Sequence, residues 1–270
     1  MDTYNLSGVL SHLPADFPWR SRIRFLEEVD STNNLAKEMA VQNAPAGTVV
    51  LAARQSAGRG RMGRQFSSPA GMGVYCSVLL RPRCAPSELM HLTCASAVAA
   101  RRAVIRSSGV NPSIKWINDL VAGKRKLSGT LTEMSISPES GLVSYAVIGI
   151  GINCCQTLSD FPEELQDKAC SLRMLTGYSP DLNVVAAGLI LELQALDAGL
   201  LTQKEETMAE YRKSCMTLGK EISVVSGQEV CHAFAEDIER DGGLIIRLPD
   251  GTRRTVNAGE VSVRGMYGYL

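Results

Sequence analysis

The sequence has no net charge and few aromatic residues, and both features disfavour a role in binding RNA or other anions through a basic surface. Its 28 basic residues balance its 28 acidic ones, and Phe, Trp and Tyr make up 5% of 270 residues. Proteins that bind RNA or other anions through a basic surface interleave aromatic residues with cations, so an anion- or RNA-binding module is the weaker interpretation. The chain also lacks a run of about 18 apolar residues and an N-terminal signal-like segment, so we expect neither a membrane span nor secretion.

Metal-binding and redox motifs are also missing from the sequence. None of the eight cysteines forms a Cys-x-x-Cys pair, and the three histidines lie in unrelated contexts. Cys154 and Cys155 are adjacent, which rarely allows disulfide geometry. We therefore expect a cytoplasmic protein with reduced thiols in its core, no metal site and no acid–base triad.

Acidic residues are missing between Glu38 and Glu88, where six arginines occur instead. Three of these arginines belong to the run Gly58-Arg59-Gly60-Arg61-Met62-Gly63-Arg64, which follows the apolar residues 49–53. Glycines let the backbone approach a ligand closely, and arginines present planar cationic forks to carboxylates and phosphates. A strand that ends in such a loop predicts an anion-binding clamp.

Gly58, Gly60 and Gly63 also match the spacing of a dinucleotide fingerprint, but their flanks do not fit it. That motif requires a helix directly after the glycines and an acidic residue about twenty positions further on. Here residues 67–71 read Ser-Ser-Pro-Ala-Gly, and the first acid is Glu88. The dinucleotide interpretation is therefore rejected, as is a protein kinase, because His-Arg-Asp and Asp-Phe-Gly motifs are absent.

Hydrophobic periodicity predicts alternating strands and helices up to about residue 218, followed by short strands. We expect strands at 22–28, 48–53, 74–80, 114–116 and 128–134, and a buried central strand at 143–152. Helices are expected after residues 30–34, over 87–106, and along two apolar stripes, the second of which ends at Gly219. Residues 1–20 are predicted to be irregular, and Asn118-Asp119 to form a turn. Five short strands are expected at 222–225, 229–234, 243–248, 253–256 and 261–264, which suggests a small SH3-like or OB-like barrel.

An ordered series of motifs resembles the biotin protein ligases. The segments are Asp30-Ser-Thr-Asn33, Gly58–Arg64, Lys115-Trp-Ile-Asn-Asp119, Lys126-Leu-Ser-Gly129 with Glu133, and Gly149-Ile-Gly-Ile-Asn153. Gly259-Glu260 and the residues up to Arg264 continue the similarity near the C-terminus. One such motif is weak support, whereas five in this order are specific. The Gly–Arg loop distinguishes the pattern from the related lipoate ligases, which remain the alternative acyl-adenylate ligase.

The resemblance implies an α+β fold in two parts. A mixed sheet with flanking helices, similar to the catalytic domain of class II synthetases, is expected over residues 1–218. A small C-terminal SH3-like β-barrel is expected over 219–270. Some ligases of this family carry an N-terminal DNA-binding domain. Because only about twenty residues precede the first predicted strand, we expect a monofunctional ligase without specific nucleic-acid or membrane binding.

The resemblance also implies a reaction and the residues that carry it. The reaction activates biotin with ATP, and Mg²⁺ carried by the nucleotide, as biotinyl-5′-AMP, and then transfers biotin to a lysine of a biotin carboxyl carrier protein. Lys126, Arg61 and Arg59 take the catalytic and lid positions. Ser31, Thr32 and Gln55 match residues that bind the ureido ring of biotin. The remaining expected ligand-binding residues are Asn33, Gly58, Gly60, Phe66, Lys115, Asn118, Asp119, Gly129, Gly149, Gly151, Asn153 and Arg264.

Two positions depart from the family pattern. Phe66 stands where the family commonly has a tryptophan that stacks on adenine, and Ile117 replaces a proline of the Lys-Trp-x-Asn-Asp turn. Phenylalanine keeps an aromatic face but offers less area. Asp119 and Glu133 are open between a structural role, as a turn cap and a lysine partner, and a metal or nucleotide role. A homodimer is possible on family grounds.

Overall fold

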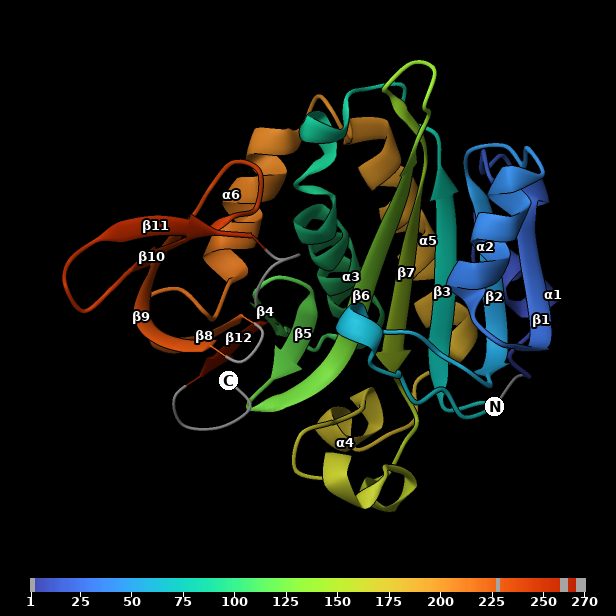
Figure 1. Cartoon of the computed structure of the whole chain (residues 1–270). Helices are drawn as coiled ribbons and strands as arrows, with labels where there is room; N and C mark the ends of the chain where they lie inside the picture. The colour runs from blue at the N-terminus through green and yellow to red at the C-terminus, as the bar shows by residue number, and fades with distance from the viewer. Residues whose placement is uncertain (1–2, 227–228, 258–261, 266–270) are drawn as a thin grey trace.

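A seven-stranded mixed sheet forms the centre of the molecule (Figure 1). The computed structural model describes residues 3–226, 229–257 and 262–265. The strand order is β1-β2-β3-β7-β6-β5-β4; β1 and β2 pair in parallel and the other neighbours pair antiparallel. The strands are β1 (Ile23–Val29), β2 (Thr48–Gln55), β3 (Gly73–Leu80), β4 (Ser113–Lys115), β5 (Asp119–Ala122), β6 (Arg125–Ile136) and β7 (Val143–Asn153).

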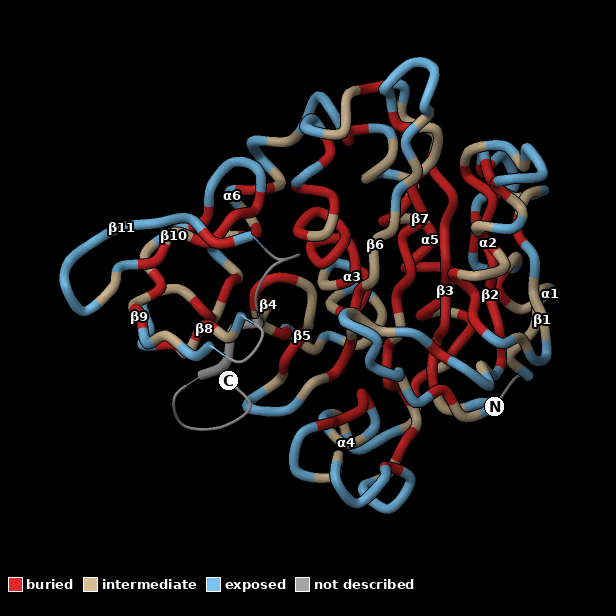
Figure 2. Tube along the Cα trace, viewed as in Figure 1, coloured by how far each residue is buried: buried red, intermediate tan, exposed pale blue. Residues whose placement is uncertain are grey.

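The predicted central strand is confirmed, because β7 lies in the middle of this order. Every residue of its neighbour β3 is buried, and β7 is buried along most of its length (Figure 2). Strands covered on both faces read as continuous apolar runs rather than alternating ones. This burial explains why the run 143–152 was recognisable from sequence.

Helices cover both faces of the sheet. α2 (Thr32–Val41) lies on one face over β2, β3 and β7, while α3 (Leu92–Ser108) and α5 (Leu182–Gly199) pack together on the other (Figure 1). Further helices are α1 (Leu6–Ser11), α4 (Leu172–Thr176) and α6 (Lys204–Ser214). Short 3-10 turns are η1 (Arg20–Arg22), η2 (Arg61–Gly63), η3 (Pro86–Leu89), η4 (Leu158–Asp160) and η5 (Glu163–Leu165).

Among the described residues, α5 alone is long and apolar enough, by length and composition, to cross a membrane, with a mean hydropathy of 1.4. In the structure 61% of it is buried, and Leu189, Ile190 and Leu193 are inaccessible to solvent. Its apolar character is therefore accounted for by packing in the core against α3.

The C-terminal strands form a separate five-stranded antiparallel sheet in the order β11-β10-β9-β8-β12. They are β8 (Glu221–Ser226), β9 (Glu229–Ile238), β10 (Leu244–Arg247), β11 (Arg253–Val256) and β12 (Ser262–Gly265). All five short predicted strands are confirmed to within a few residues. The indole Nε1 of Trp116 donates to the carbonyl of Gly242 at 2.9 Å, which joins this sheet to the turn after β4.

Residues 1–20 were predicted to be irregular; residues 12–19 form no helix or strand, as predicted, but Leu6–Ser11 do. α1 forms there, and Val9, Leu13, Phe17 and Trp19 are buried in the main core. Val9, Leu13 and Phe17 are four residues apart, but Pro14 and Pro18 interrupt the segment and α1 ends at Ser11. Packing against the rest of the chain, rather than a continuous amphipathic helix, therefore orders these residues.

Three predicted boundaries also differ. The helix expected from Ser87 begins at Leu92, after η3, in which the Glu88 carboxylate accepts the Ala85 N–H at 2.8 Å. The helix expected to end at Gly219 ends at Ser214, because Cys215 turns extended and pairs with Ile114. Asp119 begins β5 instead of lying in a turn.

Candidate active site

The Gly–Arg loop folds back on itself as a small hairpin, hereafter the Gly58–Phe66 hairpin. The N–H of Phe66 donates to the carbonyl of Gly58 at 2.9 Å, and the N–H of Gly60 to that of Arg64 at 2.7 Å. At the tip, Met62 and Gly63 adopt left-handed φ angles of 55° and 72°. The loop is thus a defined hairpin that follows β2.

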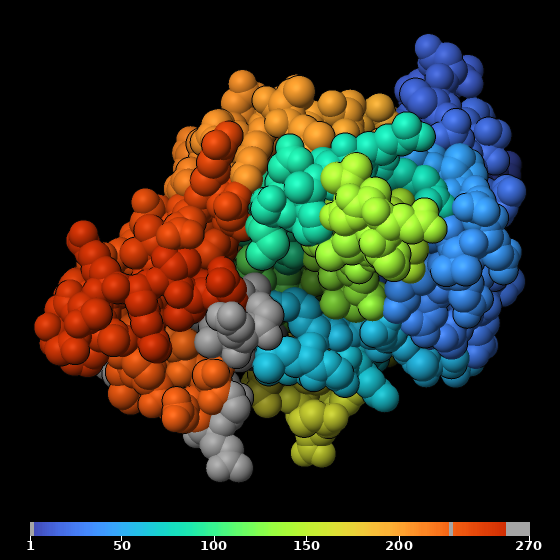
Figure 3. Space-filling view, turned by 45° about the horizontal axis from the view of Figure 1, so that its top comes forward, coloured from blue at the N-terminus to red at the C-terminus, as the bar shows by residue number. Residues whose placement is uncertain are grey.

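This hairpin lies over a cleft formed by the start of α2 and the middle of β6 and β7, and a hollow is visible beside it in Figure 3. The cavity has a volume of about 50 Å³. Most of the predicted site residues line it, together with three that sequence reasoning missed. The lining consists of Ser31, Thr32, Asn33, Gln55, Arg59, Gly60, Arg61, Phe66, Asn118, Lys126, Gly129, Thr130, Leu131, Gly149, Ile150 and Gly151, of which Thr130, Leu131 and Ile150 were missed.

Polar side chains at the start of α2 form the floor of the cleft. The N–H and Oγ1 of Thr32 donate to Gln55 Oε1 at 2.9 and 3.1 Å, and Gln55 Nε2 donates to Ser68 Oγ at 2.8 Å. Ser31 is the N-cap residue of α2, yet its side chain makes no capping bond, so the buried hydroxyl is directed elsewhere than to the helix. The buried Ser77 hydroxyl lies 2.8 Å from Thr32 Oγ1 and 2.6 Å from Asn33 Oδ1.

Two glycines of β7 make room for neighbouring side chains. A Cβ added at Gly149 would overlap the amide of Asn33, and one at Gly151 would overlap the ring of Phe66. Phe66 also packs edge-on against Tyr75, with ring centroids 6.4 Å apart. Gly149 and Gly151 therefore allow the Asn33 and Phe66 side chains to approach the β7 backbone closely, as glycines inside a strand predict.

Lys126 and Arg61 bring positive charge to the other side of the cleft. Lys126 Nζ lies 2.7 Å from Asp119 Oδ1, and both side chains are mostly buried. Arg61 Nη1 donates to Asn118 Oδ1 at 3.1 Å, and Asn118 Nδ2 in turn donates to the carbonyl of Thr130 at 2.8 Å. Burial lowers the pKa of Arg61, but an arginine keeps its charge across the physiological range.

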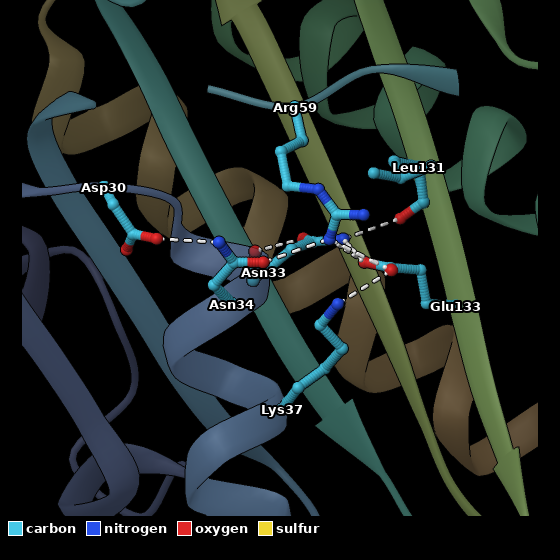
Figure 4. A network of polar contacts seen from close by, with 8 residues as sticks. Asp30, Asn33, Asn34, Lys37, Arg59, Leu131 and Glu133 are labelled. Carbon is cyan, nitrogen blue, oxygen red and sulfur yellow. Dashed lines mark hydrogen bonds and ion pairs between the residues drawn. The ribbon is translucent and has the colours of Figure 1, made fainter. Parts of the chain in front are cut away.

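Arg59 points toward Glu133 of β6 (Figure 4). Its Nη1 lies 3.0 and 3.1 Å from the two carboxylate oxygens of Glu133, which also accepts Lys37 Nζ at 2.8 Å and Asn33 Nδ2 at 3.0 Å. Burial raises the pKa of Glu133, but the hydrogen bonds from Lys37 and Asn33 and the nearby positive charges outweigh it and lower that pKa overall. Glu133 is therefore the lysine partner that one of the two open interpretations expected.

Five predicted site residues do not line the cavity. Gly58 is buried at the base of the hairpin, Lys115 is half-buried on β4, and Asp119 pairs with Lys126. Asn153 is buried and donates its amide to the Cys170 carbonyl at 3.1 Å. Arg264 belongs to β12, but its side chain, like the predicted Gly259-Glu260 pair, lies outside the described residues.

Comparisons with known proteins agree with the motif series. Residues 25–153 match the biotin/lipoate A/B protein ligase family, and residues 217–264 match the biotin protein ligase C-terminal domain. The bifunctional ligase/repressor BirA of Bacillus spizizenii is 40% identical over 235 residues, which are 87% of this chain and 72% of the relative. The biotin–[acetyl-CoA-carboxylase] ligase of Mycobacterium tuberculosis is 31% identical over 250 residues, 90% of this chain and 89% of the relative.

Solved structures are similar over the same region. The biotin protein ligase from Aquifex aeolicus in complex with biotin and ATP superposes with a TM-score of 0.76 at 28% identity, over 90% of this chain and 99% of that one. The ligase from Leishmania major in complex with biotinyl-5′-AMP gives a TM-score of 0.60 at 26% identity, over 88% and 99%. The α+β fold is therefore shared with enzymes crystallised with these ligands.

Proposed function

Because the chain belongs to the biotin protein ligase family and is a biotin-ligating enzyme, we propose that it makes biotinyl-5′-AMP and transfers biotin to a biotin carboxyl carrier protein. The supporting observation is the single cleft in which Lys126, Arg61 and Arg59 meet the polar start of α2 and the glycines of β7. These residues come from separate parts of the chain, and the fold brings them together.

In the first step, a carboxylate oxygen of biotin attacks the α-phosphorus of ATP, and the bond to the bridging oxygen of pyrophosphate breaks. Two anions must approach each other, so the barrier falls when fixed cations neutralise them in a site with little water. Lys126 takes this role. Its pairing with Asp119 at 2.7 Å holds the ammonium at the edge of the cleft, beside Gly129, before substrates bind.

The floor of the cleft supplies the biotin site. Ser31, Thr32 and Gln55 present hydroxyl and amide groups in a largely buried setting, where a cyclic urea finds both donors and acceptors. Phe66, packed on Gly151, offers an aromatic face to the nucleotide. Mg²⁺ enters with the ATP phosphates. Asn153 is proposed for the adenylate side and Arg264 for the ATP phosphates, while Lys115 and Asn118 are proposed as ligand-binding residues.

In the second step, the deprotonated amine of a carrier lysine attacks the carbonyl carbon of the mixed anhydride, and AMP leaves. The intermediate must survive until the carrier arrives, so water has to be kept from the anhydride. The Gly58–Phe66 hairpin, in which Arg61 donates to Asn118, acts as the lid that keeps water from the anhydride.

The proposed domain division is a catalytic unit over residues 1–218 and a C-terminal unit over residues 219–270, and the proposed assembly is a homodimer.

The test is label transfer. Purified protein is incubated with radiolabelled biotin, ATP and a carrier domain, and parallel reactions receive lipoate in place of biotin. We expect ATP-dependent labelling of the carrier lysine in the reactions with biotin and none in the reactions with lipoate. Transfer of lipoate but not of biotin would replace the proposal with a lipoate ligase, and absence of both transfer and biotin-binding heat would leave an anion-binding module.

A further inference from the structure

Glu133 accepts hydrogen bonds from two separate parts of the chain, at the centre of Figure 4. Arg59 reaches it from the Gly58–Phe66 hairpin, and Lys37 and Asn33 reach it from α2. Its side chain is 23% exposed, compared with 40% for Arg59. The carboxylate is thus fixed from two sides by charge-assisted hydrogen bonds, which are stronger than neutral ones.

The geometry at Arg59 leaves part of its guanidinium for another partner. All three of its hydrogen bonds to described residues use Nη1, two to Glu133 and one to Asn34 Oδ1 at 3.0 Å. A guanidinium carries five N–H donors in a planar fork. Arg59 can therefore stay bound to Glu133 and still direct its remaining nitrogens toward an anion in the cleft that it lines.

The surroundings of Glu133 argue against a metal role. Two cationic side chains lie within 3.0 Å of its oxygens, and their positive charge opposes the approach of Mg²⁺. Within the described residues, no group of three or more His, Cys, Asp or Glu side chains is arranged to hold a metal ion. The carboxylate is used instead to bind cationic side chains.

We propose that Glu133 is the positioning residue that holds Arg59, and with it the Gly58–Phe66 hairpin, closed over the adenylate. This inference rests on the proposed function, because it assumes that a reactive intermediate is retained under the hairpin. Glu133 itself does not touch the substrates in this role. It acts through Arg59, across a sequence separation of 74 residues.

The same carboxylate connects the hairpin to the biotin site. Asn33 donates to Glu133, its Oδ1 accepts from Ser77, and Ser77 contacts Thr32, which donates to Gln55. Polar networks of this kind, satisfied and buried, fix a single arrangement of their members. A ligand bound to Thr32 and Gln55 therefore favours the arrangement in which Glu133 is oriented to receive Arg59.

The experiment compares the escape of biotinyl-AMP from wild type, Glu133→Gln, Arg59→Gln and the double variant. Enzyme loaded with labelled biotin and ATP is mixed with a bystander protein, and random labelling and adenylate release are followed over time. We expect about tenfold faster escape in Glu133→Gln and at least as large an increase in Arg59→Gln, which also loses its contact with the anion. The double variant should release the adenylate no faster than Arg59→Gln, because Glu133 acts only through Arg59. Lys37→Met, which removes the other cation from Glu133 without touching the hairpin, should change escape less than about twofold.

The outcomes separate the possible failures. If wild type forms no adenylate, the proposed function is wrong. If wild type forms it and both single variants retain it as tightly, the positioning role is wrong. Additive effects, or a raised KM for biotin in Glu133→Gln with unchanged escape, would also overturn it, because Glu133 would then act only through Asn33. Arg59→Gln alters an exposed residue, so the comparison stands even if Glu133→Gln folds poorly.

Discussion

Replacing Lys126 by glutamine tests the charge that the first step requires. Lys126 Nζ lies 2.7 Å from Asp119 Oδ1, and the two side chains are 26% and 15% exposed. Glutamine keeps most of the length and polarity of lysine but removes the positive charge. In the proposed first step, the variant therefore loses neutralisation of the biotin carboxylate and the α-phosphate. It also leaves the Asp119 carboxylate without its lysine.

The size of both effects follows from this environment. Two unit charges about 4 Å apart interact by about 4 kcal/mol at the effective dielectric of a partly buried site, which is about a thousandfold in rate if the interaction develops in the transition state. Separating Asp119 from its cation costs about 1–3 kcal/mol of folding free energy, or a Tm lower by several degrees.

Two assays distinguish catalysis from stability. ATP–pyrophosphate exchange in the presence of biotin reports the first step, and thermal unfolding reports the fold. The double variant Lys126→Gln/Asp119→Asn removes both charges, so its Tm should return toward wild type while exchange stays about a thousandfold low. Exchange within tenfold of wild type in Lys126→Gln would refute the electrostatic role.

Three further predictions concern the lid, the floor of the cleft and the core. Arg61→Gly removes the bond to Asn118, so the adenylate should escape and label bystander lysines; full carrier specificity would contradict the lid role. Gly149→Ala forces the Asn33 amide aside, so calorimetry should show biotin binding weaker by at least tenfold, or about 1.4 kcal/mol, whereas Gly188→Ala, which meets only an ordinary contact, should bind normally. Burial lowers the pKa of His91, whose neutral ring contacts the Leu200 carbonyl, so the unfolded chain takes up a proton first and stability should fall as pH drops below about 6.5. His91→Gln should flatten that dependence in thermal unfolding, and an unchanged slope would exclude His91 as its cause.

The main sheet could be predicted where burial leaves a strong sequence pattern. The run 143–152 is apolar because β7 is covered on both faces, and the short C-terminal strands are marked by glycine-containing turns. β5 was missed because its four residues follow a turn signal and owe their extended form to pairing with β6. α1 was missed because tertiary packing, not periodicity, stabilises it.

The site residues also fall into those that a local sequence pattern predicts and those that it does not. Glycines, arginines and Lys126 stand out as residue types in short motifs, and the family resemblance placed them in one cleft. Ser77 had no such signal, because a single serine inside an apolar strand has no distinguishing local pattern, yet it joins Thr32 to Asn33. The role of Glu133 depends on Arg59, whose position 74 residues away is set only by the folded hairpin.

The Gly58–Phe66 hairpin is therefore held from two sides by different parts of the chain. On one side Arg59 binds Glu133 of β6, and on the other Arg61 binds Asn118, in the turn between β4 and β5. That turn also contains Trp116, whose indole donates to the Gly242 carbonyl of the C-terminal sheet. No described residue of the C-terminal sheet lines the cavity, so the described part of that sheet contributes to the site indirectly. It fixes the turn that presents Asn118 to Arg61, and so supports the closed position of the hairpin on the side opposite Glu133.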